Sequence, residues 1–156
     1  MRHIRDEANH MAVYSTKKTY HTRKFCGMIK LDDDAHKAVK DSGIQNGLLC
    51  VYGLGCTSAI TTIEFEPGLV HHDIEVLFQR LIPFRDTDGN IIPYKHHDTW
   101  HDQNGSSHLQ AMLLSPQTTI PICEGVLMLG EWQNITLIEL DPNDRTREVI
   151  FQIVGE

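Results

Sequence analysis

Hydrophobic and polar positions along this chain follow two periods, one typical of β-strands and the other of α-helices. Stretches rich in β-branched and aromatic residues, some with alternating apolar and polar positions, predict strands. The predicted strands are residues 11–25, 47–56, 58–66, 118–125, 126–141 and 147–155. Gly130 falls inside the longest of these stretches, so we expect a β-bulge there.

Three other stretches have the spacing of helices. Residues 31–43 begin with a cluster of aspartates, which suits the positive end of the helix dipole, and end at Gly43. Residues 69–84 place large apolar side chains at helical spacing. Residues 104–107 are turn and N-cap residues, and they predict a short helix over residues 108–115.

The order of these elements favours an α+β fold. Strands flank two to three helices with no regular strand–helix alternation, which argues against a parallel α/β sheet. The chain has 156 residues, enough for one domain with a substantial core, and it contains no linker or internal repeat. We therefore predict a single domain over residues 12–156, preceded by a flexible N-terminal extension over residues 1–11.

Composition and charge narrow the range of partners. Hydrophobic residues make up 40% of the chain, charged residues 22%, and the formal net charge is −7. A nucleic-acid partner usually requires a concentrated basic face, and a membrane span requires roughly 18–20 apolar residues; neither is present in the sequence. We expect a cytoplasmic protein with no nucleic-acid or membrane partner. A small anionic substrate is compatible, because charge in a pocket can oppose net charge.

The four cysteines form no CxxC pair, which is typical of a protein with reduced thiols. They are Cys26, Cys50, Cys56 and Cys123. We expect all but Cys56 to be small buried apolar residues. Cys56 lies in GLGCTSA, residues 53–59, where glycine allows another group to approach the backbone closely. Three interpretations of Cys56 stay open: a buried core thiol, a metal ligand, or a nucleophile paired with His96 or His108.

Four of the ten histidines lie in residues 94–115, YKHHDTWHDQNGSSHLQAMLLS. Neutral imidazole is a good zinc ligand, and His96, His101 and His108 are enough ligands for a catalytic zinc site. Their spacing matches no established zinc motif, but a predicted turn at residues 104–105 can bring the last two together. An acid/base site and an exposed polar loop are the alternatives.

The run TIPICEGVLMLGEWQNITLIELD, residues 119–141, resembles the signature of the YjbQ-type proteins, a family described as secondary thiamine-phosphate synthase enzymes. That signature contains IP, a GxWQ element and an apolar strand, and the family's terminal strand ends in GE, as residues 155–156 do. Shorter upstream elements match in the same order. They are TSA at 57–59, HD at 72–73, YxH at 94–96, Asn104 and SHL at 107–109. The resemblance extends from about residue 12 to the end of the sequence.

The chain departs from the family pattern at three places. Cys56 stands where the family usually has histidine before TSA. The family's GTWQ reads GEWQ in this chain, with Glu131 in place of threonine. Residues 115–117 read SPQ in place of GPS. Thiolate binds zinc as imidazole does, so the change at Cys56 retains a metal ligand. This substitution favours a metal site over an imidazole used only for proton transfer.

The resemblance implies two packed β-sheets and a homotrimer around a threefold axis. It also implies an activity that joins hydroxymethylpyrimidine pyrophosphate to thiazole phosphate, with a divalent cation that neutralises the departing pyrophosphate. A small phosphorylated molecule is the implied partner, with Arg80, Arg85 or Lys95 as candidate contacts. The alternatives are a non-enzymatic metal- or ligand-binding trimer and a metal-dependent hydrolase.

Carried onto this sequence residue by residue, the family motifs point to one pocket. The implied catalytic residues are Asp73, His96, Asn104 and His108. The implied metal ligands are Cys56, His96 and His108, and His101 from the same segment is a further candidate ligand. The metal expected on such donors is zinc, with magnesium as the alternative.

Overall fold

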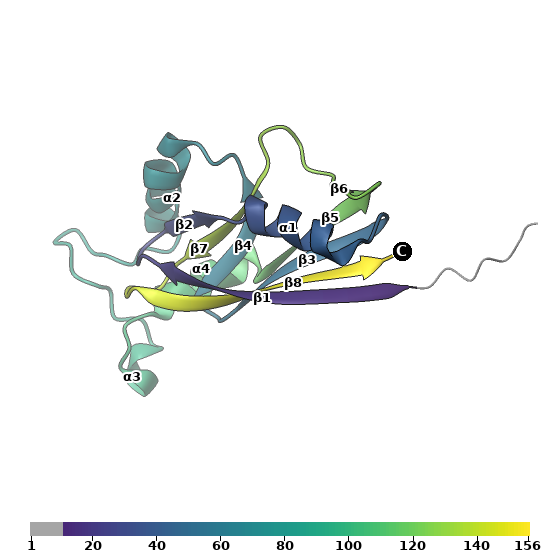
Figure 1. Cartoon of the computed structure of the whole chain (residues 1–156). Coiled ribbons are helices and arrows are strands. Elements are labelled where there is room, and N and C mark those ends of the chain that lie inside the picture. Colours follow the sequence, from purple (N-terminus) through teal and green to yellow (C-terminus); the bar gives the residue numbers. More distant parts are fainter. Residues whose placement is uncertain (1–10) are drawn as a thin grey trace, which may run out of the picture.

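Two antiparallel sheets pack against each other, and helices lie on both (Figure 1). The structure is a computed structural model and describes residues 11–156. Of the predicted extension over residues 1–11, only Met11 lies inside the described residues, where it is exposed and immediately precedes the first strand. The predicted α+β fold with two packed sheets in a single domain is confirmed.

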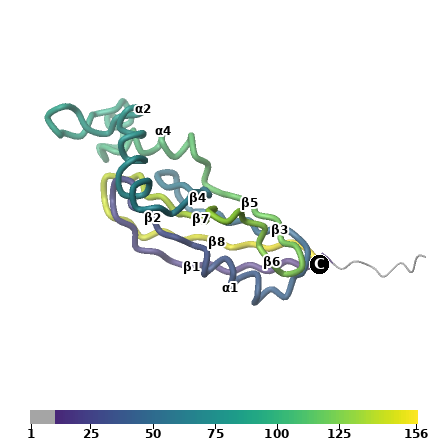
Figure 2. Tube along the Cα trace, turned by 90° about the horizontal axis from the view of Figure 1, so that it is seen from above, coloured from purple at the N-terminus to yellow at the C-terminus, as the bar shows by residue number. Residues whose placement is uncertain are grey.

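The larger sheet has five strands in the order β1-β8-β3-β5-β6, each antiparallel to its neighbours. The strands are β1 (Ala12–Thr22), β3 (Gly47–Leu54), β5 (Gln117–Cys123), β6 (Val126–Leu127) and β8 (Arg145–Gly155). β1 and β8 pair along their full lengths, from Ala12 opposite Gly155 to Thr22 opposite Arg145. The first and last strands of the described chain are therefore neighbours, as Figures 1 and 2 show.

The smaller sheet has the order β2-β7-β4. Its strands are β2 (Gly27–Lys30), β4 (Ser58–Ile63) and β7 (Asn134–Glu139). Ile60, Ile135 and Leu137 belong to the core shared with the larger sheet, whereas Ala59 and Ile138 pack with the helices on the opposite face. β7 is therefore covered on both faces, and five of its six residues are buried, including Thr136 and Glu139.

Helix α1 (Asp32–Ser42) lies along the larger sheet (Figure 2). Its buried residues Ala35, Ala38 and Val39 belong to the core that the two sheets share. The helix predicted over residues 31–43 is confirmed, and Gly43 ends it with a φ of 69°, a left-handed conformation that favours glycine. The side chain of Asp32 accepts hydrogen bonds of 2.7 Å from the Ile135 backbone N–H and from the Asn134 amide. These bonds tie the start of α1 to β7.

A second helical region covers the other face of the smaller sheet. It contains the π-helix η1 (Leu69–Asp73), α2 (Ile74–Leu81) and α4 (Gly105–Leu114), and the single turn α3 (His97–Trp100) projects away from the sheets (Figure 1). The helix predicted over residues 69–84 ends at Leu81, because Ile82 precedes Pro83 and takes an extended conformation. The short helix predicted over residues 108–115 begins earlier, at Gly105. Among residues 11–156, every helix is too short or too polar to span a bilayer.

The single strand predicted over residues 126–141 is wrong. β6 ends at Leu127, and after an intervening turn the chain enters the other sheet as β7. Gly130 is part of that turn and not of a bulge: its N–H donates to the side chain of Gln133 at 2.7 Å, and the Gln133 N–H donates back to the Gly130 carbonyl at 3.0 Å. Aliphatic residues on both sides of the turn, in β6 and in β7, gave the appearance of one strand.

The strand predicted over residues 11–25 is confirmed as β1, although it ends three residues earlier than predicted. β1 ends at Thr22, and Phe25 and Cys26 have φ angles of 49° and 61° in a left-handed turn that leads into β2. Such angles are rare outside glycine and asparagine, so the residue types in this turn gave no signal of it. The turn also carries the chain from the larger sheet to the smaller one.

Candidate functional site

A cavity of about 550 Å³ lies where three segments of the chain meet. They are the turn between β3 and β4, the start of β8, and the residues from α3 to the first turns of α4. The lining side chains that carry chemistry are Cys56, His96, Asp102, His108, Arg145 and Arg147. Imidazole, thiol, carboxylate and guanidinium groups therefore border one space.

Gly105 determines how closely the segment that carries His96 approaches helix α4. A Cβ on Gly105 would lie 2.5 Å from Tyr94 Cβ and 3.2 Å from His96 Cβ, so a larger residue does not fit. The Tyr94 hydroxyl donates to the Pro83 carbonyl at 2.7 Å, and the Ser107 hydroxyl donates to the Leu140 carbonyl at 2.7 Å. These contacts fix the start of α4 against β7 and against the His96 segment.

His96 and His108 form a close pair as a result. Their ring centroids are 4.6 Å apart, with 33° between the ring planes. His96 Nδ1 lies 3.1 Å from Asp102 Oδ1, and in the orientation that satisfies both of its amide atoms Asn104 donates to the same carboxylate oxygen at 2.9 Å. When the proton is on Nδ1, the carboxylate orients the His96 ring and leaves the Nε2 lone pair available.

The environment keeps His108 neutral. Partial burial lowers the pKa of its imidazole, and the neighbouring His96 lowers it further. The carboxylates of Asp102 and Asp141 act in the opposite direction but do not reverse the shift. A neutral imidazole has a free lone pair at neutral pH, so His108 can bind a metal ion or accept a proton.

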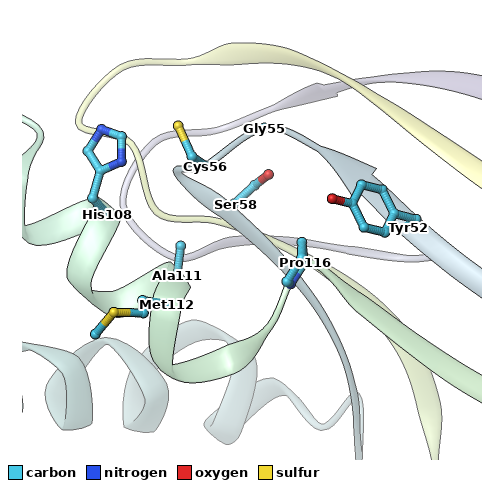
Figure 3. A pocket seen from close by; sticks show the side chains of 8 residues that line it. All are labelled: Tyr52, Gly55, Cys56, Ser58, His108, Ala111, Met112 and Pro116. Carbon is cyan, nitrogen blue, oxygen red and sulfur yellow. The ribbon is translucent and has the colours of Figure 1, made fainter.

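Cys56 is exposed, and the interpretation of this residue as a buried core thiol is wrong. Together with His108 it also borders a second cavity, of about 340 Å³, whose far end is formed by Tyr52 (Figure 3). Of the other cysteines, Cys26 is buried as expected, but Cys50 is only partly buried and Cys123 is exposed. Cys50 and Cys123 lie at outward-facing positions of β3 and β5, where buried and more exposed residues alternate. The apolar character of both strands gave no sign of this alternation in the sequence.

The structure brings four of the predicted site residues to one cavity and leaves two outside it. Cys56, His96, Asn104 and His108 line the larger cavity. His101 ends α3 in a left-handed conformation, with its ring against that of His97 at a centroid distance of 5.4 Å. Asp73 is exposed at the end of η1, where its carboxylate contacts His72 Nδ1 at 2.8 Å.

The predicted metal ligands are not assembled into a complete set. Within residues 11–156, no group of three or more His, Cys, Asp or Glu side chains has the arrangement of a metal site. The donors themselves suit a metal such as zinc, because two imidazoles and a thiol border the same space. The Asp102 contact to His96 is also the kind of carboxylate support that metal-bound histidines receive.

The arginines of the cavity, Arg145 and Arg147, were not predicted. The expected phosphate contacts lie elsewhere: the Arg85 guanidinium stacks 4.5 Å from the Phe25 ring centre, and Lys95 pairs with Asp98 at 3.6 Å. Arg80 borders a separate cavity beside α2. The last strand begins with RTR, residues 145–147, and the strand before it contains the buried carboxylate of Glu139. Two arginines that follow such a strand are the only sign of these residues in the sequence.

Charges on the cavity wall cancel in pairs. Arg145 Nη2 lies 2.9 Å from Asp141 Oδ1, and burial of Asp141 acts to raise the pKa of its carboxyl. The hydrogen bonds from Arg145 and the Asn143 backbone outweigh that effect, so the pKa of Asp141 lies below its usual value. Arg147 is paired with Glu139 behind the wall. The cavity is polar and contains ionised groups but has little net charge of its own.

Two packed sheets and a cavity lined by paired histidines, a thiol and arginines define an α+β protein with a candidate ligand-binding or catalytic site. A family model described as UPF0047 protein YjbQ-like matches residues 16–156. A UPF0047 protein of Methanothermobacter thermautotrophicus is 33% identical over 147 residues, covering 94% of this chain and 95% of the relative. A UPF0047 protein of Archaeoglobus fulgidus is 34% identical over 134 residues, 86% of this chain and 96% of the relative. The chain belongs to the UPF0047 YjbQ-like family.

Solved structures agree with this assignment. A YbjQ-like protein of unknown function from Sulfolobus solfataricus P2 superposes with a TM-score of 0.84 at 31% identity, covering 94% of this chain and 100% of the other. A hypothetical protein from Aeropyrum pernix K1 gives a TM-score of 0.79 at 29% identity, with 92% and 99% of the two chains covered. The similarity extends over nearly the whole length of each chain.

Proposed function

We propose that this protein is an enzyme that acts on small phosphorylated molecules and has secondary thiamine-phosphate synthase activity. One observation carries the proposal: the ring centroids of His96 and His108 lie 4.6 Å apart at the edge of a cavity. Cys56, Arg145 and Arg147 line the same cavity. The resemblance to YjbQ-type proteins supplies the substrates, hydroxymethylpyrimidine pyrophosphate and thiazole phosphate. The volume of the cavity, about 550 Å³, is in the range of small-molecule sites.

The coupling reaction makes limited chemical demands on the protein. The thiazole nitrogen donates an electron pair to the methylene carbon of the pyrimidine, and the bond from that carbon to the pyrophosphate oxygen breaks. Pyrophosphate leaves with the electron pair of the broken bond, and no proton needs to be transferred. The protein must therefore align the two reactants and stabilise the charge on the leaving group.

We include a divalent cation, zinc or magnesium, in this proposal, with Cys56, His96 and His108 as its ligands. Such an ion would supply positive charge to balance the departing pyrophosphate. The support is the donor set at the cavity, the carboxylate contact of His96, and the lowered pKa of His108, which keeps its imidazole unprotonated. Arg145 and Arg147 are each paired with a carboxylate, so a cation would add to the positive charge that the arginines offer a polyanion.

We also propose that the protein assembles as a homotrimer. The outer face of the five-stranded sheet supports this, because an apolar row crosses it at successive register positions. Val13 lies opposite Val154, Val154 opposite Leu48, and Leu48 opposite Pro121. Val13 is 67% exposed and Leu48 is 51% exposed in the single chain. An apolar strip of this kind on a sheet face is typical of an interface between subunits.

A direct assay of turnover tests the proposed activity. The purified protein is incubated with both precursors and either zinc or magnesium, and thiamine phosphate and pyrophosphate are quantified. We expect equal amounts of the two products, with rates reduced at least tenfold in His96→Gln and His108→Gln. His36→Gln is the matched control, because His36 lies on α1 and its only hydrogen-bond partner within residues 11–156 is the Asp32 carbonyl. Absence of thiamine phosphate with either metal would refute the synthase activity.

A further inference from the structure

Arg147 is held rigidly by groups behind the cavity wall. Its Nε donates to Glu139 Oε2 at 2.7 Å and its Nη2 donates to Glu139 Oε1 at 2.5 Å. Nη2 also donates to the hydroxyl of Thr57 at 2.7 Å. Glu139 accepts two further hydrogen bonds, from the Thr22 hydroxyl at 2.6 Å and the Asp141 N–H at 2.9 Å. The guanidinium is thus fixed by β7 and by the turn that precedes β4.

This arrangement is costly for a purely structural contact. The Glu139 side chain is fully buried and that of Arg147 is only 11% exposed. Removing two charges from water costs several kcal/mol per ion, and well-packed apolar residues stabilise a core about as well as such a pair does. A buried ion pair beside a cavity is therefore better explained by what it presents to that cavity.

The nitrogen of Arg147 that remains available to the cavity is Nη1. Arginine has five N–H donors, and the bonds above use Nε and Nη2. Within residues 11–156, Nη1 makes no hydrogen bond, and it is not among the buried polar atoms that lack a partner, so it is accessible at the cavity that Arg147 lines. Nη1 also lies against Gly55, where a Cβ would come within 2.9 Å of it. Gly55 has a φ of +149°, which likewise favours glycine.

We infer that Arg147 is the anion-binding residue of the cavity and donates through Nη1 to a phosphate or pyrophosphate oxygen of the ligand. The choice of phosphate chemistry rests on the proposed function. Glu139 acts as a positioning residue, because it fixes the guanidinium without approaching the ligand itself. Gly55 serves the same site by leaving room beside Nη1.

Arg145 has a different place at the same cavity. Its side chain is 42% exposed and its carboxylate partner is Asp141, so it is held less firmly than Arg147. A rigid donor that is already oriented loses less conformational entropy when it binds an anion, which favours Arg147 as the main contact. Arg145 provides a second, adjustable positive charge near the cavity mouth.

Binding of inorganic pyrophosphate to metal-free protein tests the inference. Isothermal titration calorimetry is run in the presence of EDTA on the wild type, Arg147→Lys and Gly55→Ala. Lysine keeps the positive charge beside Glu139 but loses the planar fork, and alanine at position 55 places a methyl group against Nη1 without changing any charge. Each variant should weaken binding on the order of tenfold, since one charge-assisted hydrogen bond is lost or distorted.

Gly89→Ala is the matched control for Gly55→Ala. Gly89 also has a positive φ, +85°, but a Cβ there has no neighbour within 4 Å. The control therefore carries backbone strain without obstruction, and it should bind pyrophosphate as the wild type does. Melting curves identify any variant that fails to fold, and Arg147→Lys and Gly55→Ala perturb the site by independent routes.

The outcomes separate this inference from the proposed function. Pyrophosphate binding that depends on Arg147 and Gly55, in a protein that does not make thiamine phosphate, supports the anion site and refutes the synthase activity. If the wild type makes thiamine phosphate but the folded Arg147→Lys and Gly55→Ala variants bind pyrophosphate with unchanged affinity, the anion site is overturned. No measurable pyrophosphate binding by the wild type also overturns it. Malonate binding as tight as pyrophosphate binding would overturn the assignment to phosphate.

Discussion

Gly105 packs against Tyr94 so closely that a single added methyl group would lie 2.5 Å from the Tyr94 Cβ. An exposed helix position normally gains stability when glycine is replaced by alanine, by up to about 1 kcal/mol. At Gly105 the sign should reverse, and Gly105→Ala should lose about 1–3 kcal/mol because the segment carrying His96 must move. Urea unfolding of the variant and the wild type measures the difference. A more stable variant would show that the contact is not tight.

Substitutions of Cys56 test whether it binds metal. Cys56→His should retain bound zinc, because it restores the residue that the family usually has, and Cys56→Ala should lose much of it. Metal content by mass spectrometry and melting temperature with and without EDTA provide the measurement. Zinc retained at the wild-type level in Cys56→Ala would refute Cys56 as a ligand.

The cysteines should differ in their reaction with iodoacetamide. Burial, together with the nearby Glu75, raises the pKa of the Cys26 thiol to about 12, so it holds almost no thiolate at neutral pH. Cys56 and Cys123 are exposed and should be modified first. Peptide mass spectrometry after brief labelling of native protein measures each site. Labelling of Cys26 at the rate of Cys123 would contradict the buried position of Cys26.

Asp141 should contribute to the dependence of stability on pH. Its native pKa lies below the usual value, mainly because the bonds from Arg145 and the Asn143 backbone outweigh burial. A lowered native pKa stabilises the folded state at pH values above the unfolded pKa of about 3.9, and this contribution disappears as the pH falls through the native pKa. Asp141→Asn should therefore cost about 1–3 kcal/mol at pH 7 and much less near pH 2. Unfolding free energies at both pH values provide the test, and an equal loss at each would contradict this assignment.

The apolar row on the outer sheet face should be required for trimer formation. Leu48→Asp places a charge in the centre of that row and should convert the trimer to monomer at micromolar concentration. Leu77→Asp is the control, since Leu77 on α2 is 50% exposed, nearly the same as the 51% of Leu48. Light scattering gives the mass of both variants. A trimer retained in Leu48→Asp would move the interface elsewhere, and a wild-type monomer would refute the trimer.

Elements with a single, consistent environment were predictable from the sequence. The helix from Asp32 to Ser42 has an apolar stripe, an acidic start and a glycine end, and each of these signals is local. Changes of sheet were not predictable in this way. Residues 126–141 are rich in aliphatic side chains on both sides of the turn, yet β6 and β7 belong to different sheets. The turn between them depends on the side chain of Gln133, which has no strong turn preference.

In the candidate site too, some residues could be predicted from the sequence and others could not. The residue pattern and the family motifs together predict Cys56, His96, Asn104 and His108 as site residues. The structure places all four at one cavity, and their roles stay predictions. Arg147 could not be predicted from the sequence, because its partner Glu139 lies on a strand of the other sheet and no sequence period links two such positions. The prediction of His101 as a ligand rests only on its place in the same segment as His96. His101 itself takes a left-handed conformation at the end of α3, and its side chain does not line the cavity.

The position of β8 in the middle of its sheet has a consequence for synthesis of the chain. β8 joins β1 on one side and β3 on the other, and it is the last strand of residues 11–156 to leave the ribosome. Until it emerges, β1 lacks its partner and Arg147 is absent from Glu139 and Thr57. Pairings between such distant residues form slowly and leave apolar edges open to other chains meanwhile. The sheet and the anion site should therefore form together, late, and in a single step after translation of β8.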